Sequence, residues 1–206
     1  MSAQEPADDA ELRHRVRRIL AVFRAIAAHM HASGGDARES ARHLVGRIGA
    51  IGRAGLAASS GGMDLHSLVL DELLTLGAQR AATVNGPTVR LNARSAELMS
   101  LAIHELATNA VKFGALSQSQ TELRVVWWFT DTAGSRLHFE WAEDGVRIPR
   151  DRRHNRGFGS QVIERMIAAE LHGDGEMLLL REGMLCTIEL PAREALLQHE
   201  AAPQDE

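Results

Sequence analysis

Cysteine, aromatic residues and long apolar runs are scarce in this sequence. Its 206 residues contain one cysteine, so no internal disulfide can form, and the disulfide-rich class of small secreted domains is excluded. Tyrosine is absent and aromatic residues make up 4% of the chain, which argues against a nucleic-acid surface built on base stacking. No apolar run reaches the roughly 18 residues that cross a bilayer, so membrane insertion is not expected.

A strong charge of either sign is also missing. The 23 basic and 27 acidic residues leave a formal net charge of -4, and such a balance does not attract nucleic acid or an anionic membrane. Residues 1–10 are acidic and lack the apolar core of a signal peptide, so a cytoplasmic protein with a disordered N-terminus is expected.

The segment 11–58 has the pattern of a helical hairpin. Apolar residues recur at alternating steps of four and three, a period that packs helices side by side, at Leu12, Val16, Ile19, Phe23, Ile26 and Met30. A second helix follows, with a predicted packed stripe of Ala41, Leu44, Ile48 and Ile51. Its glycines at 46, 49, 52 and 55 each cost about 1 kcal/mol relative to alanine, so packing must hold it. The hairpin predicts a homodimeric four-helix bundle or a fold back onto the rest of the chain.

Residues 63–192 mix helical and strand patterns and predict a second domain, with its boundary in the flexible segment 57–62. Helices are expected over 66–78, 95–115 and 160–171, the second with Ser95 as its N-cap. Strands are expected over 88–92, 121–130, 136–143, 176–181 and 184–190, and the last four form two hairpins. This order predicts an α+β fold with helices on one face of a mostly antiparallel sheet. The polar segment 193–206 is expected to fray.

His14 lies off the predicted seam of the first helix, among four arginines. It is either a solvated surface histidine or a nucleophile, because a neutral imidazole has a free ring nitrogen and arginines favour an incoming phosphoryl group. The spacing alone leaves both interpretations open.

Glu105, Asn109 and Lys112 share one face of the predicted helix 95–115. An amide oxygen is a suitable ligand for Mg²⁺, an ammonium offsets phosphate charge, and a carboxylate can orient or deprotonate an attacking group. The face therefore suits a magnesium-polyphosphate site. The alternative is an exposed helix face with an ordinary Glu-Lys pair.

Four motifs, in order, resemble those of the HWE family of sensor histidine kinases. The segment 104–116, His-Glu-Leu-Ala-Thr-Asn-Ala-Val-Lys-Phe-Gly-Ala-Leu, resembles the family's N box, and residues 12–22 resemble its phosphoacceptor helix. Trp141-Ala142-Glu143 resembles the Trp-x-Glu signature, and Gly157-Phe158-Gly159-Ser160 the second glycine box. The likeness runs from about residue 11 to 191. It implies a dimerising hairpin followed by an ATP-binding sandwich of the GHKL (Bergerat) type.

The resemblance also implies roles for single residues. His14 would be the phosphorylated residue, Glu105 the catalytic carboxylate and Asn109 the Mg²⁺ ligand. His104 and Lys112 would lie near the phosphates or ribose of ATP. The other nucleotide-binding positions would be Glu143, which would read the adenine amino group, and Gly145, Gly157, Gly159, Ser160 and Thr187.

Two departures from the family pattern make the activity uncertain. Arg18 replaces an asparagine four residues after the phosphoacceptor, and a guanidinium cannot accept a hydrogen bond. The first glycine box has Val146 where the family has a second glycine. With about ten residues before the first helix, no sensory domain is expected, which implies regulation by a sensory or regulatory partner protein, or constitutive activity.

The leading hypothesis is an ATP-dependent histidine kinase of a two-component system that passes its phosphoryl group to a response-regulator receiver domain. The alternative is a degenerate, non-catalytic phosphotransfer or regulator-binding module. A third reading, an ATPase or serine kinase without phosphohistidine, is disfavoured by the hairpin.

Overall fold

A computed structural model of the chain describes residues 13, 16–17, 20–28, 37–59, 61–78, 82–130, 135–147 and 157–197. His14 and Arg18 lie outside the described residues. The chain divides into two compact units, Met1–Val45 and Gly46–Glu206. This division falls within helix α2 (Ala37–Ser59) and not in the segment 57–62.

The first unit contains helical residues 20–28 and the beginning of α2. On the predicted seam, Ile26 is fully buried and Phe23 half-buried, whereas Val16 is 47% exposed. Leu12, Ile19 and Met30 lie outside the described residues. No helix in the described ranges, in either unit, is long and apolar enough to cross a membrane.

The second unit is built on a five-stranded sheet with the order β2-β4-β5-β7-β6. The parallel β2–β4 pair stands beside antiparallel β4–β5, β5–β7 and β7–β6 pairs, so both predicted hairpins and the α+β class are confirmed. A separate two-stranded ladder joins β1 to β3. The strands are β1 (Met63–Asp64), β2 (Ala82–Asn85), β3 (Arg90–Leu91), β4 (Glu122–Phe129), β5 (Arg136–Asp144), β6 (Asp174–Leu180) and β7 (Gly183–Pro191).

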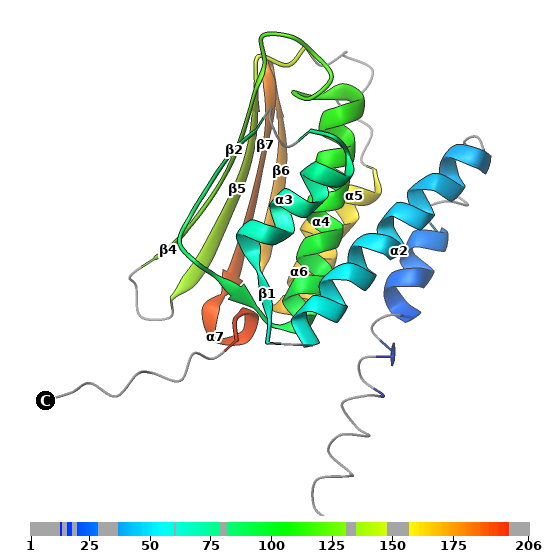
Figure 1. Ribbon diagram of the computed structural model, residues 1–206, viewed down its shortest axis with the longest axis vertical. Coiled ribbons are helices and arrows are strands. Elements are labelled where there is room, and N and C mark those ends of the chain that lie inside the picture. Colours follow the sequence, from blue (N-terminus) through cyan, green and yellow to red (C-terminus); the bar gives the residue numbers. More distant parts are fainter. Residues whose placement is uncertain are drawn as a thin grey trace, which may run out of the picture. The chain divides into compact units, whose positions relative to one another are not determined.

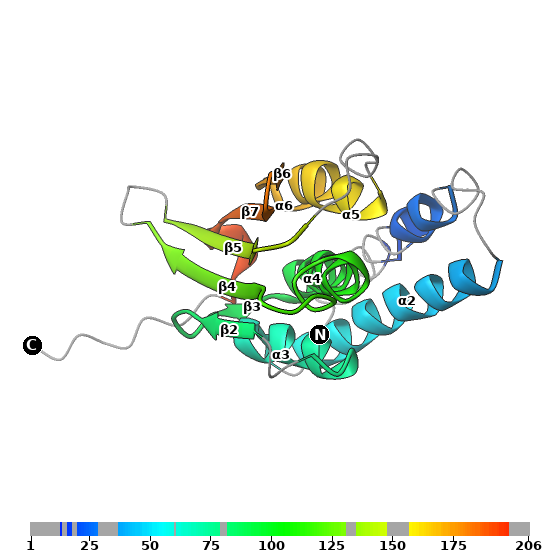
Figure 2. The ribbon, with the colours of Figure 1, turned by 90° about the horizontal axis from the view of Figure 1, so that it is seen from above.

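Helices cover one face of this sheet (Figures 1 and 2). They are α3 (Leu65–Thr75), α4 (Ala93–Phe113) and the continuous run α5 (Phe158–Gln161), η3 (Val162–Met166) and α6 (Ile167–Leu171). The short α7 (Ala192–Ala195) directly follows β7 at the end of the sheet (Figure 1). Fourteen residues of α4 are buried, because this helix lies between its neighbours and the sheet. Its apolar stripe through Met99, Ile103 and Leu106 is fully buried, as the sequence pattern requires.

Three local expectations are wrong. Asn92, and not Ser95, caps α4, because its Oδ1 accepts the Ser95 N–H at 2.9 Å. The predicted polar segment 193–206 begins with regular structure: residues 192–195 form α7 and Leu196 bridges to Leu91, while residues 198–206 lie outside the described residues. The expected strand 88–92 shrinks to β3, and the neighbouring short strand β2 is not foreseen.

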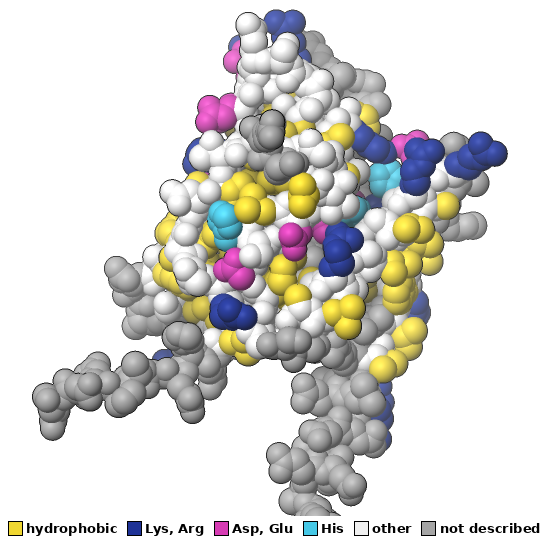
Figure 3. Space-filling view, in the orientation of Figure 1, with side chains coloured by type: hydrophobic (Ala, Val, Ile, Leu, Met, Phe, Trp, Pro, Cys, Tyr) yellow, Lys and Arg dark blue, Asp and Glu magenta, His cyan; other side chains and the backbone are white. Residues whose placement is uncertain are grey.

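The packed face of α2 also differs from the predicted stripe. From Gly46 onward its buried residues are Arg47, Ala50, Ala54, Gly55 and Ala58, while Ile48 is 40% exposed. A Cβ at Gly46 would lie 2.7 Å from Nε2 of His104 in α4, so small residues allow the close approach that larger apolar side chains would prevent. Exposed apolar side chains remain along the helix layer (Figure 3).

Candidate functional site

The centre of the site is Glu105, near the middle of α4. Its side chain is 9% exposed, and both carboxylate oxygens accept hydrogen bonds from Arg47 of α2. Arg47 Nε lies 2.7 Å from Oε1, and Arg47 Nη2 lies 3.0 Å from Oε2. The guanidinium carbon also lies 4.2 Å from the centre of the Phe158 ring at the start of α5. The predicted N box and second glycine box therefore meet at one arginine.

Gly159 brings α5 against the same turn of α4. A Cβ at this position would lie 3.2 Å from Glu105 Cβ and 3.8 Å from Asn109 Nδ2. A larger side chain would push the two helices apart. The structure thus brings together Glu105, Asn109 and Gly159, as the motif order implied, and leaves Asn109 half-buried.

The remaining residues of these two motifs lie around this group. Lys112 is exposed in the last turn of α4. Gly157, the N-cap of α5, has open space where a Cβ would stand. Ser160 is half-buried, and its Oγ lies 3.9 Å from the sulfur of Met177 in β6.

His104 points to a different neighbourhood. Its Nδ1 lies 2.9 Å from Oε2 of Glu72 in α3, and Arg53 of α2 donates to the other oxygen of Glu72. His104 and Glu72 are both buried. Its described contacts are with α3 and with Gly46 of α2, and not with the group around Asn109.

Glu143 is the second buried carboxylate of the site and is 2% exposed at the end of β5. Its Oε1 accepts the indole N–H of Trp141 at 3.0 Å, and its Oε2 accepts the backbone N–H of Ala115 at 2.7 Å. Burial raises the pKa of Glu143, and these two hydrogen bonds lower it by a smaller amount. Gly114 is required beside it, because a Cβ there would overlap Oε2.

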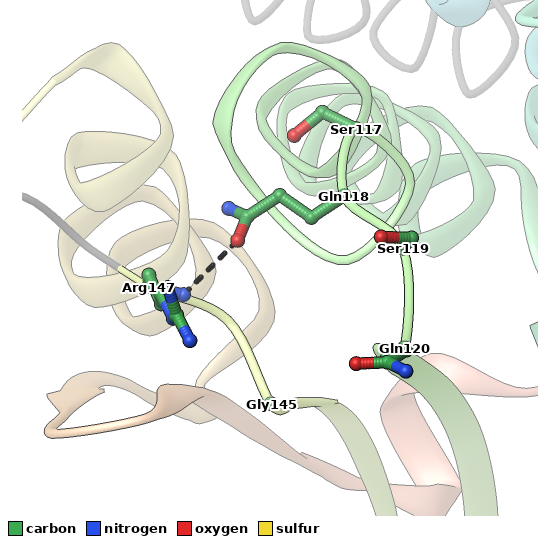
Figure 4. A pocket seen from close by; sticks show the side chains of 6 residues that line it. All are labelled: Ser117, Gln118, Ser119, Gln120, Gly145 and Arg147. Carbon is green, nitrogen blue, oxygen red and sulfur yellow. Dashed lines mark hydrogen bonds between the residues drawn. The ribbon is translucent and has the colours of Figure 1, made fainter.

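An open polar pocket of about 480 Å³ is lined in part by Gly145, two residues after Glu143 in the sequence. Gly145 has a φ of 75°, a conformation that favours glycine, and a Cβ there would lie 2.9 Å from the Gln120 carbonyl oxygen. Gln118 points across the pocket and accepts the Arg147 N–H at 3.2 Å (Figure 4). The lining residues are Ser117, Gln118, Ser119, Gln120, Gly145 and Arg147.

Thr187 is not brought to this pocket. It is half-buried in β7, between Glu140 of β5 and Glu176 of β6. Its neighbours Cys186 and Ile188 are buried, and successive side chains of a strand point to opposite faces. The side chain of Thr187 therefore lies on the sheet face away from the helices, and its place beside the adenine stays a prediction from the resemblance.

The donors present fit a magnesium nucleotide in part. Among the described residues no group of three or more His, Cys, Asp or Glu could hold a metal ion. Asn109 could therefore supply one oxygen ligand, and phosphate oxygens and water would complete the coordination. Gly159 packs directly against Glu105 and Asn109, whereas Gly157 at the N-cap of α5 has open space where a Cβ would stand. The pocket at Gly145 is lined by polar side chains that could hydrogen-bond a nucleotide.

Arg47 belongs to none of the sequence motifs and is the functional candidate that they miss. It is separated by 58 residues from Glu105, so no local pattern reveals the pair. The one signal is spacing: Arg47, Ala50 and Ala54 share a helix face, and a charged residue on a face of small residues needs a buried partner.

Comparison with known proteins finds similarity to histidine kinases. A model of the HWE histidine kinase family matches residues 11–88. The blue-light-activated histidine kinase 1 of Erythrobacter litoralis is 32% identical over 195 residues, which cover 90% of this chain and 53% of that protein. A blue-light-activated histidine kinase of Rhizobium johnstonii is 29% identical over 185 residues, 88% of this chain and 52% of that protein. The chain spans about half the length of these curated relatives.

The fold has a counterpart among solved structures. The histidine kinase domain from the Erythrobacter litoralis EL346 blue-light activated histidine kinase superposes with a TM-score of 0.54 at 17% identity, covering 86% of this chain and 95% of that domain. The α+β fold is therefore that of a histidine kinase domain, as the sequence motifs implied.

Proposed function

We propose that the chain is an HWE histidine kinase, because the family model and the curated relatives point to the same family, and that it transfers the γ-phosphoryl group of ATP to His14 and then to an aspartate of a response-regulator receiver domain. The single observation that supports this most is the meeting of Glu105, Asn109 and Gly159 at one turn of α4. Two motifs 54 positions apart in the chain join there around a half-buried amide.

Each side of the site has a distinct task in this proposal. Asn109 and water hold Mg²⁺, which offsets the charge of the phosphates. Lys112, exposed at the end of α4, adds positive charge for the phosphates. The pocket at Gly145 takes the nucleoside. The family resemblance assigns the exocyclic amine of adenine to Glu143, which is buried and whose two oxygens also accept the Trp141 and Ala115 N–H groups.

The chemistry needs little covalent work from the protein. A ring nitrogen of His14 forms a bond to the γ-phosphorus while the bond to the bridging oxygen breaks and ADP leaves. Glu105 orients the imidazole or accepts its proton. In the second step the phosphorus–nitrogen bond breaks as an aspartate oxygen of the regulator bonds to phosphorus. The roles of His14 and Arg18, which lie outside the described residues, rest on the family resemblance.

The decisive test is labelling with γ-labelled ATP and Mg²⁺. The wild type should acquire an acid-labile label, and His14→Ala and Asn109→Ala should lose it. His43→Ala in α2 serves as the matched control and should retain the label. Label that persists in His14→Ala would overturn the assignment of His14.

A degenerate module that grips a regulator or receives phosphate from another kinase is the second candidate. It is favoured by Arg18, which replaces an asparagine of the family pattern, and by the shortened glycine box at Gly145-Val146. Titration with MgATP separates the two candidates. Undetectable binding by the wild type would favour the degenerate module, whereas binding with labelling favours the kinase. Homodimerisation through the hairpin stays a prediction that light scattering tests.

A further inference from the structure

Arg47 belongs to none of the sequence motifs but contacts two of them, the N box and the second glycine box. Its guanidinium donates to both oxygens of Glu105 in α4 and lies 4.2 Å above the ring of Phe158 in α5. The side chains of Arg47 and Glu105 are 7% and 9% exposed. Phe158 is 1% exposed. Arg47 of α2 thus links Glu105 of α4 to Phe158 of α5 in one buried group, the Arg47 group.

The chemistry of the Arg47 group is specific to arginine. A planar guanidinium matches a carboxylate with two parallel hydrogen bonds and also stacks on an aromatic ring. Lysine would offer a single point of charge and no planar face. Two-point contact removes the freedom of the Glu105 carboxylate to rotate, and the ring contact ties that carboxylate to Phe158 and hence to the neighbouring Gly159.

Arg53, two turns further along α2, provides a contrast. It also donates to a buried carboxylate, that of Glu72, but its own side chain is 48% exposed and its hydrogen bond is to one oxygen, Oε1. Glu72 lies in α3 and bonds His104. The Arg53 contact therefore fastens α2 to the domain without touching Glu105 or α5.

We propose that Arg47 is a positioning residue for phosphoryl transfer: it fixes the Glu105 carboxylate and aligns the N box with the second glycine box around Asn109. This inference rests on the proposed kinase function. Because α2 is one continuous helix from Ala37 to Ser59, a shift of α2 at Arg47 would displace the Glu105 carboxylate. The position of α2 would thereby control the rate of transfer.

The test measures the initial labelling rate at saturating MgATP and, separately, the Kd for MgATP. Arg47→Met should lower the rate by about 100-fold, the cost of a misplaced catalytic group, and should change the Kd by less than about threefold, because the residues assigned to nucleotide binding are not altered. Arg47→Lys should recover part of the rate. Arg53→Met is the matched control, since it removes a cation from the same helix and leaves the Glu105 contacts in place.

A double-mutant cycle shows whether Arg47 acts through Glu105. The variant Arg47→Met/Glu105→Gln should label no more slowly than Glu105→Gln alone, because the function of Arg47 is lost once its partner carboxylate is gone. If Arg47→Met leaves Glu105 buried without a partner and fails to fold, Arg47→Lys takes its place in the cycle, because it keeps a positive charge beside Glu105 and loses the planar two-point contact.

The outcomes separate this inference from the proposed function. A wild type that does not label overturns both. A wild type that labels on His14, with Arg47→Met labelling equally fast or faster, overturns the role of Arg47 and leaves the kinase function standing. Additive losses in the cycle, or an equal loss in Arg53→Met, would reduce Arg47 to a structural contact and also overturn the inference.

Discussion

Glu105 and Glu143 are two buried carboxylates of one site, and they are held in different ways. Glu105 pairs with the charged guanidinium of Arg47, whereas Glu143 accepts hydrogen bonds from two uncharged donors, the indole of Trp141 and the backbone of Ala115. A charged partner offsets the loss of hydration directly. Neutral donors do so only in part, which is why burial raises the pKa of Glu143.

This difference means that the two halves of the site should fail differently. The Glu105 side depends on one ion pair between α2 and α4, so loss of charge disrupts it. The Glu143 side depends on a close fit between the end of β5 and residues 114–115, so added volume or a lost N–H donor disrupts it. Variants on each side can therefore test whether the two carboxylates are held independently.

The largest effect is expected for Gly114→Ala. Its Cβ would overlap Glu143 Oε2 and lie 2.7 Å from the Ala110 Cα, so the backbone must move and the Ala115 hydrogen bond is lost. The free energy of unfolding should fall by about 3 kcal/mol, as for a strongly overpacked core, and urea unfolding measures it. Gly157→Ala, which meets open space, should stay within about 1 kcal/mol of the wild type. Equal stability of the two variants would show that Glu143 is not tightly enclosed.

The next largest effect is expected when a buried tryptophan loses its N–H donor, and it should differ between Trp141 and Trp127. Trp141→Phe removes the donor to the Glu143 carboxylate, and Trp127→Phe removes a donor to the Pro87 carbonyl oxygen. Hydrogen bonds to charged groups contribute about 1.5–3 kcal/mol and neutral ones about 1 kcal/mol, so Trp141→Phe should be the less stable. It should also weaken MgATP binding, because Glu143 loses its orientation, while Trp127→Phe should bind normally. Matching Kd values would contradict an orienting role for Trp141.

The sequence predicts the elements better than their contacts. The long helix over α4 and both hairpins follow from strong periodic patterns, and α4 begins within two residues of the prediction. Asn92 was missed as the cap because Ser95, three residues later, is an equally good capping residue by type. Strands as short as β1 and β3, of two residues each, carry too few positions for an alternating pattern.

In the site, too, residues within motifs are predictable and long-range contacts are not. Asn109 and Gly159 were placed together because each belongs to a recognisable motif. Arg47 could not be found that way, because it pairs with a residue 58 positions away and α2 was expected to pack with its large apolar residues. The structure instead buries Ala50 and Ala54, since a close approach selects small side chains, and this turns the face that carries Arg47 inward.

A smaller effect is expected in the pH dependence of stability. The pKa of Glu143 is raised from 4.5 in the folded chain, so the folded state keeps a proton that the unfolded state has lost. The stabilisation is complete below about pH 4.5 and is lost as pH rises through the raised pKa. As pH rises from about 4.5 through the raised pKa, the free energy of unfolding of the wild type should therefore decline relative to that of Glu143→Gln, which cannot titrate. Parallel pH profiles of the two proteins would contradict a raised pKa.

The smallest effect is expected at the glycines of α2, the helix that carries Arg47. Gly52 is exposed and a Cβ there meets nothing within 4 Å, so Gly52→Ala should stabilise the helix by about 1 kcal/mol through propensity alone. Gly46→Ala, whose Cβ would press on the His104 ring, should destabilise it instead. Hydrogen exchange of α2 amides measures both, and amides of β5 beside Glu143 serve as the internal control. If Gly52→Ala slows exchange in β5 as much as in α2, the two carboxylates do not belong to separately stabilised regions, and the contrast between them fails.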